Sequence, residues 1–274
     1  MDKLVFLKLG GSLITDKNQP YTIRLDKLAQ VAHEIKSALS RITDLHLILG
    51  HGSGSFGHYA VKEHAPFLLS PTFQGKWEEV DEGWQGFSEV WFRASQLNRC
   101  VIEALHEANV PVITLPPSAL VDARDGIIKH WDLTSLRAAL QTGLIPVIYG
   151  DIVFDVVNGG TILSTEALIF YLAHHLPPER ILLAGLETAV WADFPARYQK
   201  VEKVTPTTVA SITNRLGGSH GTDVTGGMRS KVEDMVRLVQ QIPTLSVQIF
   251  SGEEAGNVER ALSGELLGTL VTSD

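Results

Sequence analysis

One stretch of this chain, residues 45–58, constrains its fold more than any other. It begins as an apolar run of strand length and continues with four glycines within eight residues before it ends on His58. Glycine lets backbone N–H groups turn inward, because no Cβ blocks the approach of a ligand. Such a nest of donors at the end of a strand is typical of an anion site, and a histidine can add positive charge. We interpret the stretch as a phosphate-binding loop that includes Ser53 and Gly54; a glycine-rich surface turn is the alternative.

A lysine interrupts the first apolar run of the chain. Lys8 lies within residues 4–9, directly before Gly10, Gly11 and Ser12. A lysine in a strand that is covered on both sides is costly unless it has an anionic partner or reaches a cleft. The glycines that follow favour the cleft. Lys17 comes next in a loop, where a lone lysine is more often a solvated charge.

The order of the expected elements indicates an α/β fold. Apolar spacing over residues 25–39 predicts a helix between the two strands that precede the glycine turns. Further strands are expected at 110–115, 145–149, 181–184, 246–250 and 270–271. Further helices are expected up to about 109, over 133–142 and from near 166. Hairpin turns are expected at 122–126 and 158–160, and an irregular segment at 66–87. This alternation is typical of parallel sheets with ligand loops at the carboxyl ends of strands.

A second glycine-rich stretch, residues 217–231, includes Gly226 and Gly227 and leads into an expected amphipathic helix. Lys231 is expected in the first turn of that helix, where the helix dipole disfavours a cation, so a functional role is favoured. The helix N-terminus is suited to a polyphosphate. Gly150 and Asp151 follow the strand at 145–149 and are site candidates by position; the alternative role for Asp151 is that of a turn former.

Composition limits the possible partners and location. The net charge of −8 on 274 residues argues against a general nucleic-acid binder. The single cysteine, Cys100, allows no internal disulfide and is expected in the core. No stretch has transmembrane length and no cleavable signal pattern is present, so we expect a cytoplasmic protein without membrane contact. Trp77, Trp84 and Trp91 are spaced by seven, which is more typical of a core or a subunit interface than of a cofactor site.

Two glycine loops and three lysines point to one chemical task, the holding of several phosphate groups. Phosphoryl transfer needs mainly positioning and positive charge around the transferred group. The chain has neither a Walker motif nor the protein-kinase signature set.

Together these motifs resemble the amino acid kinase superfamily, in the form of the isopentenyl phosphate kinases. The similar segments are residues 8–12 with 15–17, the loop 51–58 with its final histidine, residues 86–88, 117–118 and 149–151, and residues 223–228 with Lys231.

The resemblance implies an open αβα sandwich with a mainly parallel central sheet, built as one domain with an acceptor-binding lobe (about 1–178) and an ATP-binding lobe (about 179–274). It implies a homodimer that uses ATP and Mg²⁺ to convert isopentenyl phosphate to isopentenyl diphosphate, with no metal ligand assigned to the protein. The implied catalytic residues are Lys8, Lys17, His58 and Lys231. Ser53, Gly54, His58, Gly150 and Asp151 would bind the acceptor, and Lys8, Gly10, Gly11, Ser12, Gly54, Glu166, Gly226, Gly227 and Lys231 would bind ATP.

The chain departs from the family pattern in three places. In the loop 51–58, Ser53 stands where the family usually has glycine. Glu166 replaces the first aspartate of the family's glycine-aspartate-aspartate, and residues 185–190 lack both aspartates of the ATP lobe. Two alternatives therefore stay open, a kinase of another small phosphate or phosphonate, similar to fosfomycin kinases, and a non-catalytic nucleotide or phosphate sensor. The acceptor's apolar pocket would distinguish the two kinases, and its candidate walls are Phe73, Trp77, Trp84, Phe87 and Trp91.

Overall fold

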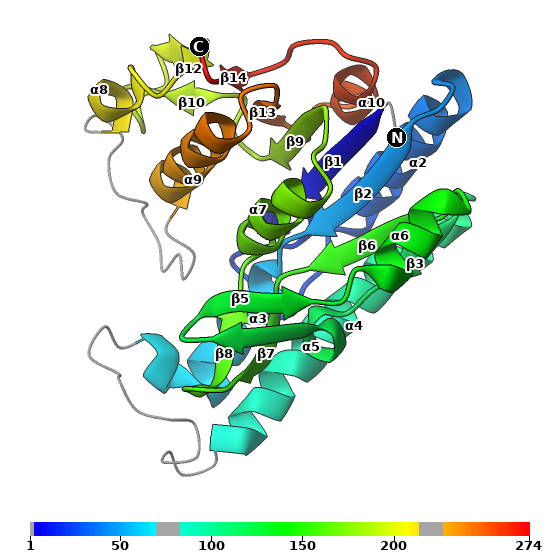
Figure 1. The fold of residues 1–274 in the computed structure, drawn as a ribbon, viewed down its shortest axis with the longest axis vertical. Coiled ribbons are helices and arrows are strands. Elements are labelled where there is room, and N and C mark those ends of the chain that lie inside the picture. Colours follow the sequence, from blue (N-terminus) through cyan, green and yellow to red (C-terminus); the bar gives the residue numbers. More distant parts are fainter. Residues whose placement is uncertain (1–2, 70–82, 214–226) are drawn as a thin grey trace.

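The computed structural model describes residues 3–69, 83–213 and 227–274 of the chain. An eight-stranded sheet crosses the molecule (Figure 1). Its strands, in spatial order, are β12 (Lys203–Val204), β14 (Thr269–Val271), β13 (Ser246–Ser251), β9 (Arg180–Gly185), β1 (Leu4–Leu9), β2 (His46–His51), β6 (Ile145–Tyr149) and β3 (Val112–Thr114). Every neighbouring pair is parallel except β13 with β14, which confirms the α/β fold with a mainly parallel sheet.

Helices cover both faces of this sheet. Apolar side chains of α6 (Thr134–Gln141), α7 (Thr165–His175) and α9 (Gly227–Gln241) form a core on one face. Those of α2 (Leu25–Arg41), α4 (Gly83–Glu107) and α10 (Asn257–Leu262) form a core on the other. The αβα sandwich is therefore confirmed.

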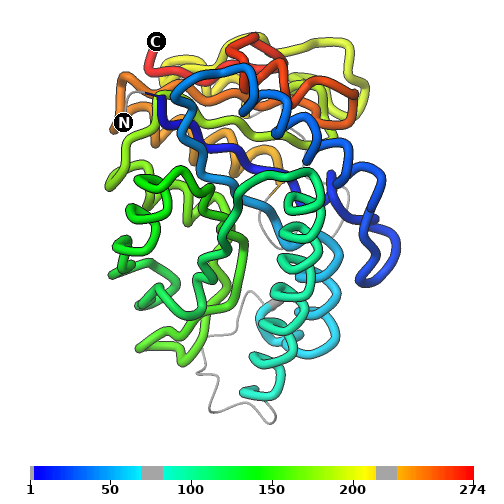
Figure 2. The backbone as a smooth tube through the Cα atoms, turned by 90° about the vertical axis from the view of Figure 1, so that its right-hand side faces the viewer, coloured from blue at the N-terminus to red at the C-terminus, as the bar shows by residue number. Residues whose placement is uncertain are grey.

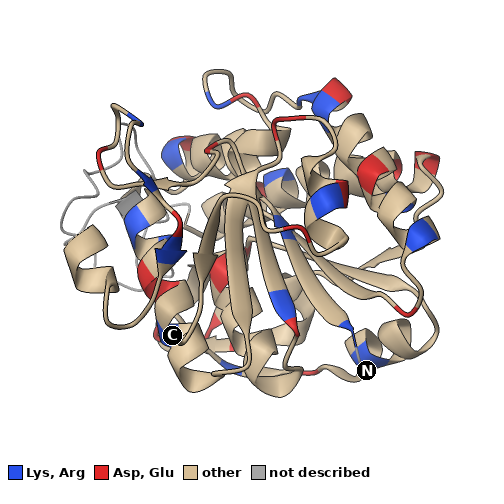
Figure 3. Ribbon diagram, turned by 90° about the horizontal axis from the view of Figure 1, so that it is seen from above, with Lys and Arg blue, Asp and Glu red and all other residues tan. Residues whose placement is uncertain are grey.

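Strand β1 shows how the sheet divides its side chains between the two cores. Successive residues of a strand point to opposite faces. Leu4 and Phe6 belong to the core on the α7–α9 face, whereas Val5 and Leu7 belong to the core on the α2–α4 face. By this alternation Lys8 points toward α7 and α9. The central strands otherwise carry few charged residues, as Figure 3 shows.

Residues before position 178 also form a smaller, four-stranded sheet. Its strands, in spatial order, are β5 (Ile127–Trp131), β4 (Val121–Arg124), β7 (Asp151–Asp155) and β8 (Gly159–Leu163). The remaining elements are α1 (Gly11–Ile14), α3 (Gly54–His64), η1 (Pro66–Leu69), α5 (Pro117–Leu120), β10 (Val190–Trp191), β11 (Lys200–Val201) and α8 (Val209–Thr213). The hairpins expected at 122–126 and 158–160 are both present. Helices α3 and α4 run side by side at the end of the molecule that carries this sheet (Figure 2).

Several expectations about local structure were wrong. The glycine loop is shorter than expected, because α3 already begins at Gly54. Part of the segment 66–87 is helical, in η1 and in the first turn of α4, and residues 70–82 lie outside the described part of the chain. Strand β3 lies at the end of the sheet and is only half-buried, since a terminal strand has a neighbour on one side only.

Two side-chain expectations, those for Cys100 and Lys231, need correction. Cys100 is half-buried and not in the core, because it lies on the flank of the amphipathic helix α4. Trp84 and Trp91 are 44% and 41% exposed, so of the two expected locations, core or subunit interface, the interface stays a prediction. Trp77 lies outside the described residues. Lys231 is the fifth residue of α9 and thus lies just past its first turn. Within the described ranges, no helix combines the length and the apolar character that a membrane crossing needs.

Candidate active site

Two glycine turns interlock where the neighbouring strands β1 and β2 end. The strands are parallel and in register, with Lys8 opposite Gly50 and Leu9 opposite His51. A Cβ atom on Gly11 would lie 2.3 Å from the backbone nitrogen of Gly54, and one on Gly52 would lie 2.8 Å from that of Gly11. Gly54 also has a φ of +51°, which L side chains rarely adopt. Only glycine therefore lets the β1–α1 and β2–α3 turns approach this closely.

A threonine hydroxyl joins the two turns. Thr15 Oγ1 donates to the carbonyl of Gly11 at 2.8 Å and accepts the backbone N–H of Ser55 at 2.9 Å. The first helical turns of α1 and α3 are thus held against each other. This places two short helix N-termini on the same side of the sheet, an arrangement that favours an anion.

Two lysines meet one carboxylate beside these turns. Lys8 Nζ lies 2.7 Å from Glu166 Oε1, and Lys231 Nζ lies 3.8 Å from the same oxygen. Lys8 and Glu166 are only 6% and 8% exposed. Burial alone would raise the pKa of Glu166, but the positive charges of Lys8 and Lys231 outweigh it and hold that pKa below its ordinary value. Glu166 is therefore ionised, and the three groups carry a net positive charge.

Most of the predicted site residues line one cavity. Those that do are Lys8, Gly11, Ser12, Lys17, Ser53, Gly54, His58, Gly150, Glu166 and Lys231. The structure thus brings together side chains from β1, α3, α7 and α9, which lie far apart in the sequence. Three described residues of the prediction, Gly10, Asp151 and Gly227, are not among the residues that line it. The N–H of Gly10 donates to the carbonyl of Ala184 at 2.7 Å, and Gly227 begins α9. Gly226 lies outside the described residues.

An adjoining cavity is mainly apolar and shares Ser53, His58, Gly150 and Ile162 with the first. Asp151 lines this second cavity. Its apolar walls, which we did not predict, are Val61, Val90, Ala94, Ile152 and Ile162. Short aliphatic side chains in helices and strands do not differ in sequence from ordinary core residues, so no pattern singled them out.

Of the aromatic residues that we expected as walls, the three that the structure describes, Trp84, Phe87 and Trp91, do not line that cavity. Phe73 and Trp77 lie outside the described residues. Phe87 and Trp91 instead line a separate cavity of about 610 Å³. Trp84 packs on Phe87 and Phe154.

Asp151 is a buried acid. One carboxylate oxygen accepts the N–H of Ser118 at 3.3 Å, and the other accepts the N–H of Ile152 at 2.9 Å. Burial raises the pKa of Asp151 to about 7, although these hydrogen bonds act in the opposite direction. The carboxyl group therefore changes charge near neutral pH.

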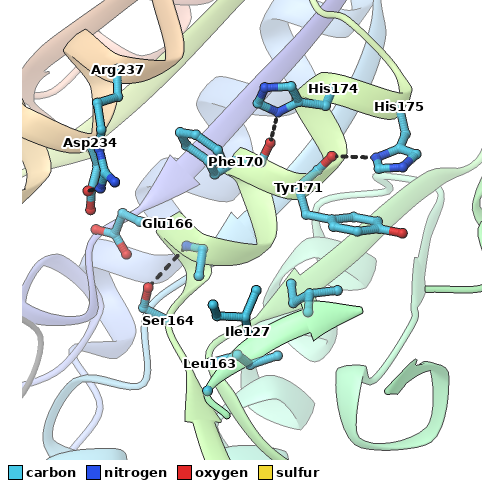
Figure 4. A pocket seen from close by; sticks show the side chains of 13 residues that line it. Ile127, Leu163, Ser164, Glu166, Phe170, Tyr171, His174, His175, Asp234 and Arg237 are labelled. Atoms are coloured by element: carbon cyan, nitrogen blue, oxygen red, sulfur yellow. Dashed lines mark hydrogen bonds and ion pairs between the residues drawn. The ribbon is translucent and has the colours of Figure 1, made fainter. Parts of the chain in front are cut away.

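A further cavity, of about 440 Å³, lies on the outer side of α7 and extends to the β4–β5 hairpin and to α9. Figure 4 shows Glu166 at its edge and Ser164 capping α7, with the Ser164 hydroxyl accepting the N–H of Ala167 at 3.1 Å. Its other polar side chains already have partners: His174 contacts Gln241, and Arg237 pairs with Asp234. Leu163, Ser164 and Glu166 line both this cavity and the one that contains Lys8 and Lys231.

Residues 185–190, which lack the two aspartates of the family's ATP lobe, contain one carboxylate, that of Glu187. Arg197 binds it through two hydrogen bonds of 2.6 and 2.8 Å. These bonds lower the pKa of Glu187 despite its partial burial. Glu187 is thus engaged within its own loop.

Comparison with known proteins agrees with this geometry. The family model described as the amino acid kinase family matches residues 3–251. The isopentenyl phosphate kinase of Methanocaldococcus jannaschii is 34% identical over 97% of each chain, and that of Methanothermobacter thermautotrophicus is 31% identical over 98% of this chain and 99% of its own. A crystal structure of isopentenyl phosphate kinase covers 98% of this chain and 100% of its own, with 29% identity and a TM-score of 0.82.

An open αβα sandwich with a cationic, glycine-walled cavity at the ends of parallel strands defines a phosphate-handling enzyme of the kinase type. The chain belongs to the amino acid kinase family. Within that family, the resemblance to isopentenyl phosphate kinases is confirmed by relatives that match it over nearly its full length.

Proposed function

We propose that this enzyme transfers a phosphoryl group from ATP to isopentenyl phosphate and so forms isopentenyl diphosphate. The observation that carries the proposal is the continuity of two cavities through His58, Ser53 and Gly150. One cavity is lined by lysines and glycine turns, and the other is small and mainly apolar. The chemistry of such a pair matches a monophosphate with a short hydrocarbon tail, with its phosphate at the shared residues. The apolar cavity, of about 30 Å³, would widen to admit the tail.

The reaction is a displacement at the γ-phosphorus of ATP. An oxygen of the acceptor phosphate forms the new P–O bond, and the bond to the bridging oxygen of ADP breaks. The acceptor oxygen is already anionic, so no general base is needed. Lys8 and Lys231 would balance the charge on the transferred group and on ADP, with Glu166 holding both ammonium groups in place. Lys17, which is exposed at the mouth of the cavity, would stabilise the transition state.

The other predicted residues have supporting roles in this proposal. The first turns of α1 and α3, with Gly11, Ser12 and Gly54, would hold phosphates through backbone N–H groups. His58 would bind the acceptor phosphate. Gly10, Gly226 and Gly227 would shape the two glycine loops of the ATP site. Asp151 would line the tail cavity and hold the Ser118 N–H rather than touch the phosphate.

We propose one domain with two lobes, divided near residue 178. All walls of the apolar cavity come from residues before this point, whereas α9 with Lys231 comes from beyond it. The first lobe would thus hold the acceptor and the second the nucleotide. The central sheet continues through both, because β1 pairs with β9.

The alternatives are less well supported. The five curated relatives that match the chain are all named isopentenyl phosphate kinases. A phosphonate kinase would have little use for the apolar walls beyond His58. A non-catalytic sensor would not need Lys8, Lys17, His58 and Lys231 around one cavity.

We assign no protein ligand to Mg²⁺. The described residues contain no cluster of three or more His, Cys, Asp or Glu side chains placed to hold a metal ion. The carboxylate in the cavity, Glu166, is engaged by two lysines. We propose that Mg²⁺ enters with the phosphates of ATP, a usual way for this ion to bind.

We also propose that the enzyme is a homodimer. Trp84, Trp91 and Phe154 are exposed along α4 and β7, around the 610 Å³ cavity, and the neighbouring β3 is the terminal strand of the sheet. Large exposed apolar patches of this kind are typical of interfaces. Trp84→Glu should shift the sedimentation of the dimer toward monomer, whereas Leu25→Glu, at an exposed leucine of α2, should not. An identical sedimentation of both variants would contradict the proposal.

A cytoplasmic location stays a prediction.

The decisive experiment measures ADP release with ATP and Mg²⁺ and with isopentenyl phosphate, dimethylallyl phosphate or fosfomycin as acceptor. We expect turnover on isopentenyl phosphate. Turnover on fosfomycin alone would move the chain to the phosphonate kinases. No turnover on any of the three, with ATP still bound, would favour the sensor.

A further inference from the structure

A buried chain of polar side chains leads from the edge of the sheet to the phosphate-binding turn. The hydroxyl of Thr114, on β3, donates to Asn98 Oδ1 at 2.7 Å. Asn98 Nδ2, on α4, lies 3.1 Å from His51 Nε2, and His51 Nδ1 lies 3.2 Å from the carbonyl oxygen of Gly52. His51 is fully buried and Asn98 nearly so.

Only one arrangement of protons satisfies every contact in this chain for a neutral imidazole. The Gly52 carbonyl can only accept, so His51 Nδ1 must carry the proton and Nε2 must accept. Asn98 then presents its NH₂ group to His51 and its oxygen to Thr114. Burial and the charge of Lys8 lower the pKa of His51 to about 4, which agrees with a neutral ring.

The ring itself is held on its other sides. His51 stacks on Tyr149 with ring centroids 5.4 Å apart and planes 8° apart. Its backbone carbonyl accepts the hydroxyl of Thr165 at 2.7 Å and the N–H of Gly150 at 3.2 Å. The imidazole therefore has little freedom to turn, and its Nδ1–H is aimed at Gly52.

We infer that His51, Asn98 and Thr114 are positioning residues that orient the Gly52–Ser53 peptide for phosphate binding. In a trans peptide the C=O and N–H groups point in opposite directions. The bond from His51 to the Gly52 carbonyl therefore turns the Ser53 N–H away from the ring. Gly52 and Ser53 line the cavity with Lys8, so this N–H is presented where the phosphates would lie. The inference rests on the proposed function only in one respect, namely which phosphate compound binds at the Ser53 N–H.

The first test is spectroscopic and needs no substrate. With ¹⁵N-labelled histidine, the His51 signals, identified by their loss in His51→Asn, should show a neutral Nδ1–H ring from about pH 5.5 to about pH 8.5. Asn98→Asp should instead favour a protonated ring, because a carboxylate needs a donor at Nε2. An Nε2–H ring in the wild type, or titration near the ordinary histidine pKa, would overturn the inference.

The second test is kinetic. Asn98→Leu removes both hydrogen bonds at similar volume and should raise the KM for isopentenyl phosphate by about tenfold or more, with a smaller change in the KM for ATP. Thr114→Val should have a weaker effect in the same direction, and Thr114→Ser, which keeps the hydroxyl, should restore the wild-type value. Gln96→Leu, which removes an exposed amide from the same helix, is the matched control.

The outcomes separate the two proposals. If the wild type is active and Asn98→Leu keeps its kinetic constants within about twofold, the positioning role is wrong. If the wild type is inactive on all three acceptors but binds inorganic phosphate, the same comparison of variants is made on phosphate affinity. A loss of affinity in Asn98→Leu then supports the positioning role although the proposed function has failed, and unchanged affinity overturns it.

Discussion

Lys8 Nζ and Glu166 Oε1 lie 2.7 Å apart with both side chains buried, and this pair joins the central strand β1 to the start of α7. Its partners are 158 residues apart in the sequence. Glu166 also faces Lys231 of α9, so one carboxylate holds the two cations that phosphoryl transfer would use.

Glu166→Gln should therefore impair both activity and stability. Loss of the negative charge leaves Lys8 buried without compensation, which costs about 3–5 kcal/mol of the free energy of unfolding. Misplaced lysines should lower kcat on the order of 10²-fold. Urea unfolding and steady-state kinetics measure the two effects. Glu233→Gln, which breaks the exposed pair with Arg229, is the control and should cost less than about 1 kcal/mol.

The same variant should change the response to acid. A lowered pKa in the folded state means that Glu166 stabilises the protein above its unfolded-state pKa of 4.5, and this stabilisation is lost as the pH falls through the lowered pKa. The stability of Glu166→Gln should depend less on pH in the acid range. Parallel acid-unfolding curves for variant and wild type would contradict this.

Lys231→Ala should lower turnover more than acceptor affinity. If Lys231 balances charge that develops on the transferred group, its loss should reduce kcat by about 10² to 10³-fold, with the KM for isopentenyl phosphate within about threefold. Lys200→Ala, which removes an exposed lysine of β11, should leave both constants unchanged. Equal activity of the two variants would show that α9 is only structural at this position.

His58→Ala should weaken acceptor binding and leave ATP binding nearly intact. His58 lines both cavities, where the acceptor phosphate and the hydrocarbon tail would meet. Loss of a hydrogen bond to a charged group costs about 1.5–3 kcal/mol, so the KM for isopentenyl phosphate should rise about 10- to 100-fold. His64→Ala, at the end of the same helix, is the control. An unchanged acceptor KM in His58→Ala would remove this residue from the site.

Asp151→Asn should stabilise the protein more at alkaline than at acid pH. The pKa of about 7 in the folded state lies above the value of 3.8 for an ordinary aspartate. The contribution of Asp151 to stability is thus fully present below pH 3.8 and is lost as the pH rises through about 7, where a buried charge forms. The difference in Tm between variant and wild type should be more positive near pH 8 than near pH 5. A difference that does not vary with pH would show that the carboxyl group stays ionised.

Much of this protein follows from its sequence alone. The strand at residues 4–9, the glycine turns that follow the first two strands, and the lysines in unfavourable positions all indicated a phosphate site in an α/β fold. These signals are local, because a glycine turn and an apolar run are properties of neighbouring residues. The cluster of Lys8, Glu166 and Lys231 was expected from family resemblance rather than from spacing.

The tertiary structure alone decided the rest. Val90 and Ala94 line the tail cavity, whereas the tryptophans of the same helix do not, because the packing of α4 against α3 and β7 sets which side of the helix meets the site. His51 stood in a recognised motif, but its link to Asn98 and Thr114 joins elements distant in sequence. Side-chain types and local periodicity determine which elements form. Which side chains meet depends on how parallel strands and their covering helices are ordered in space, and no local pattern records that order.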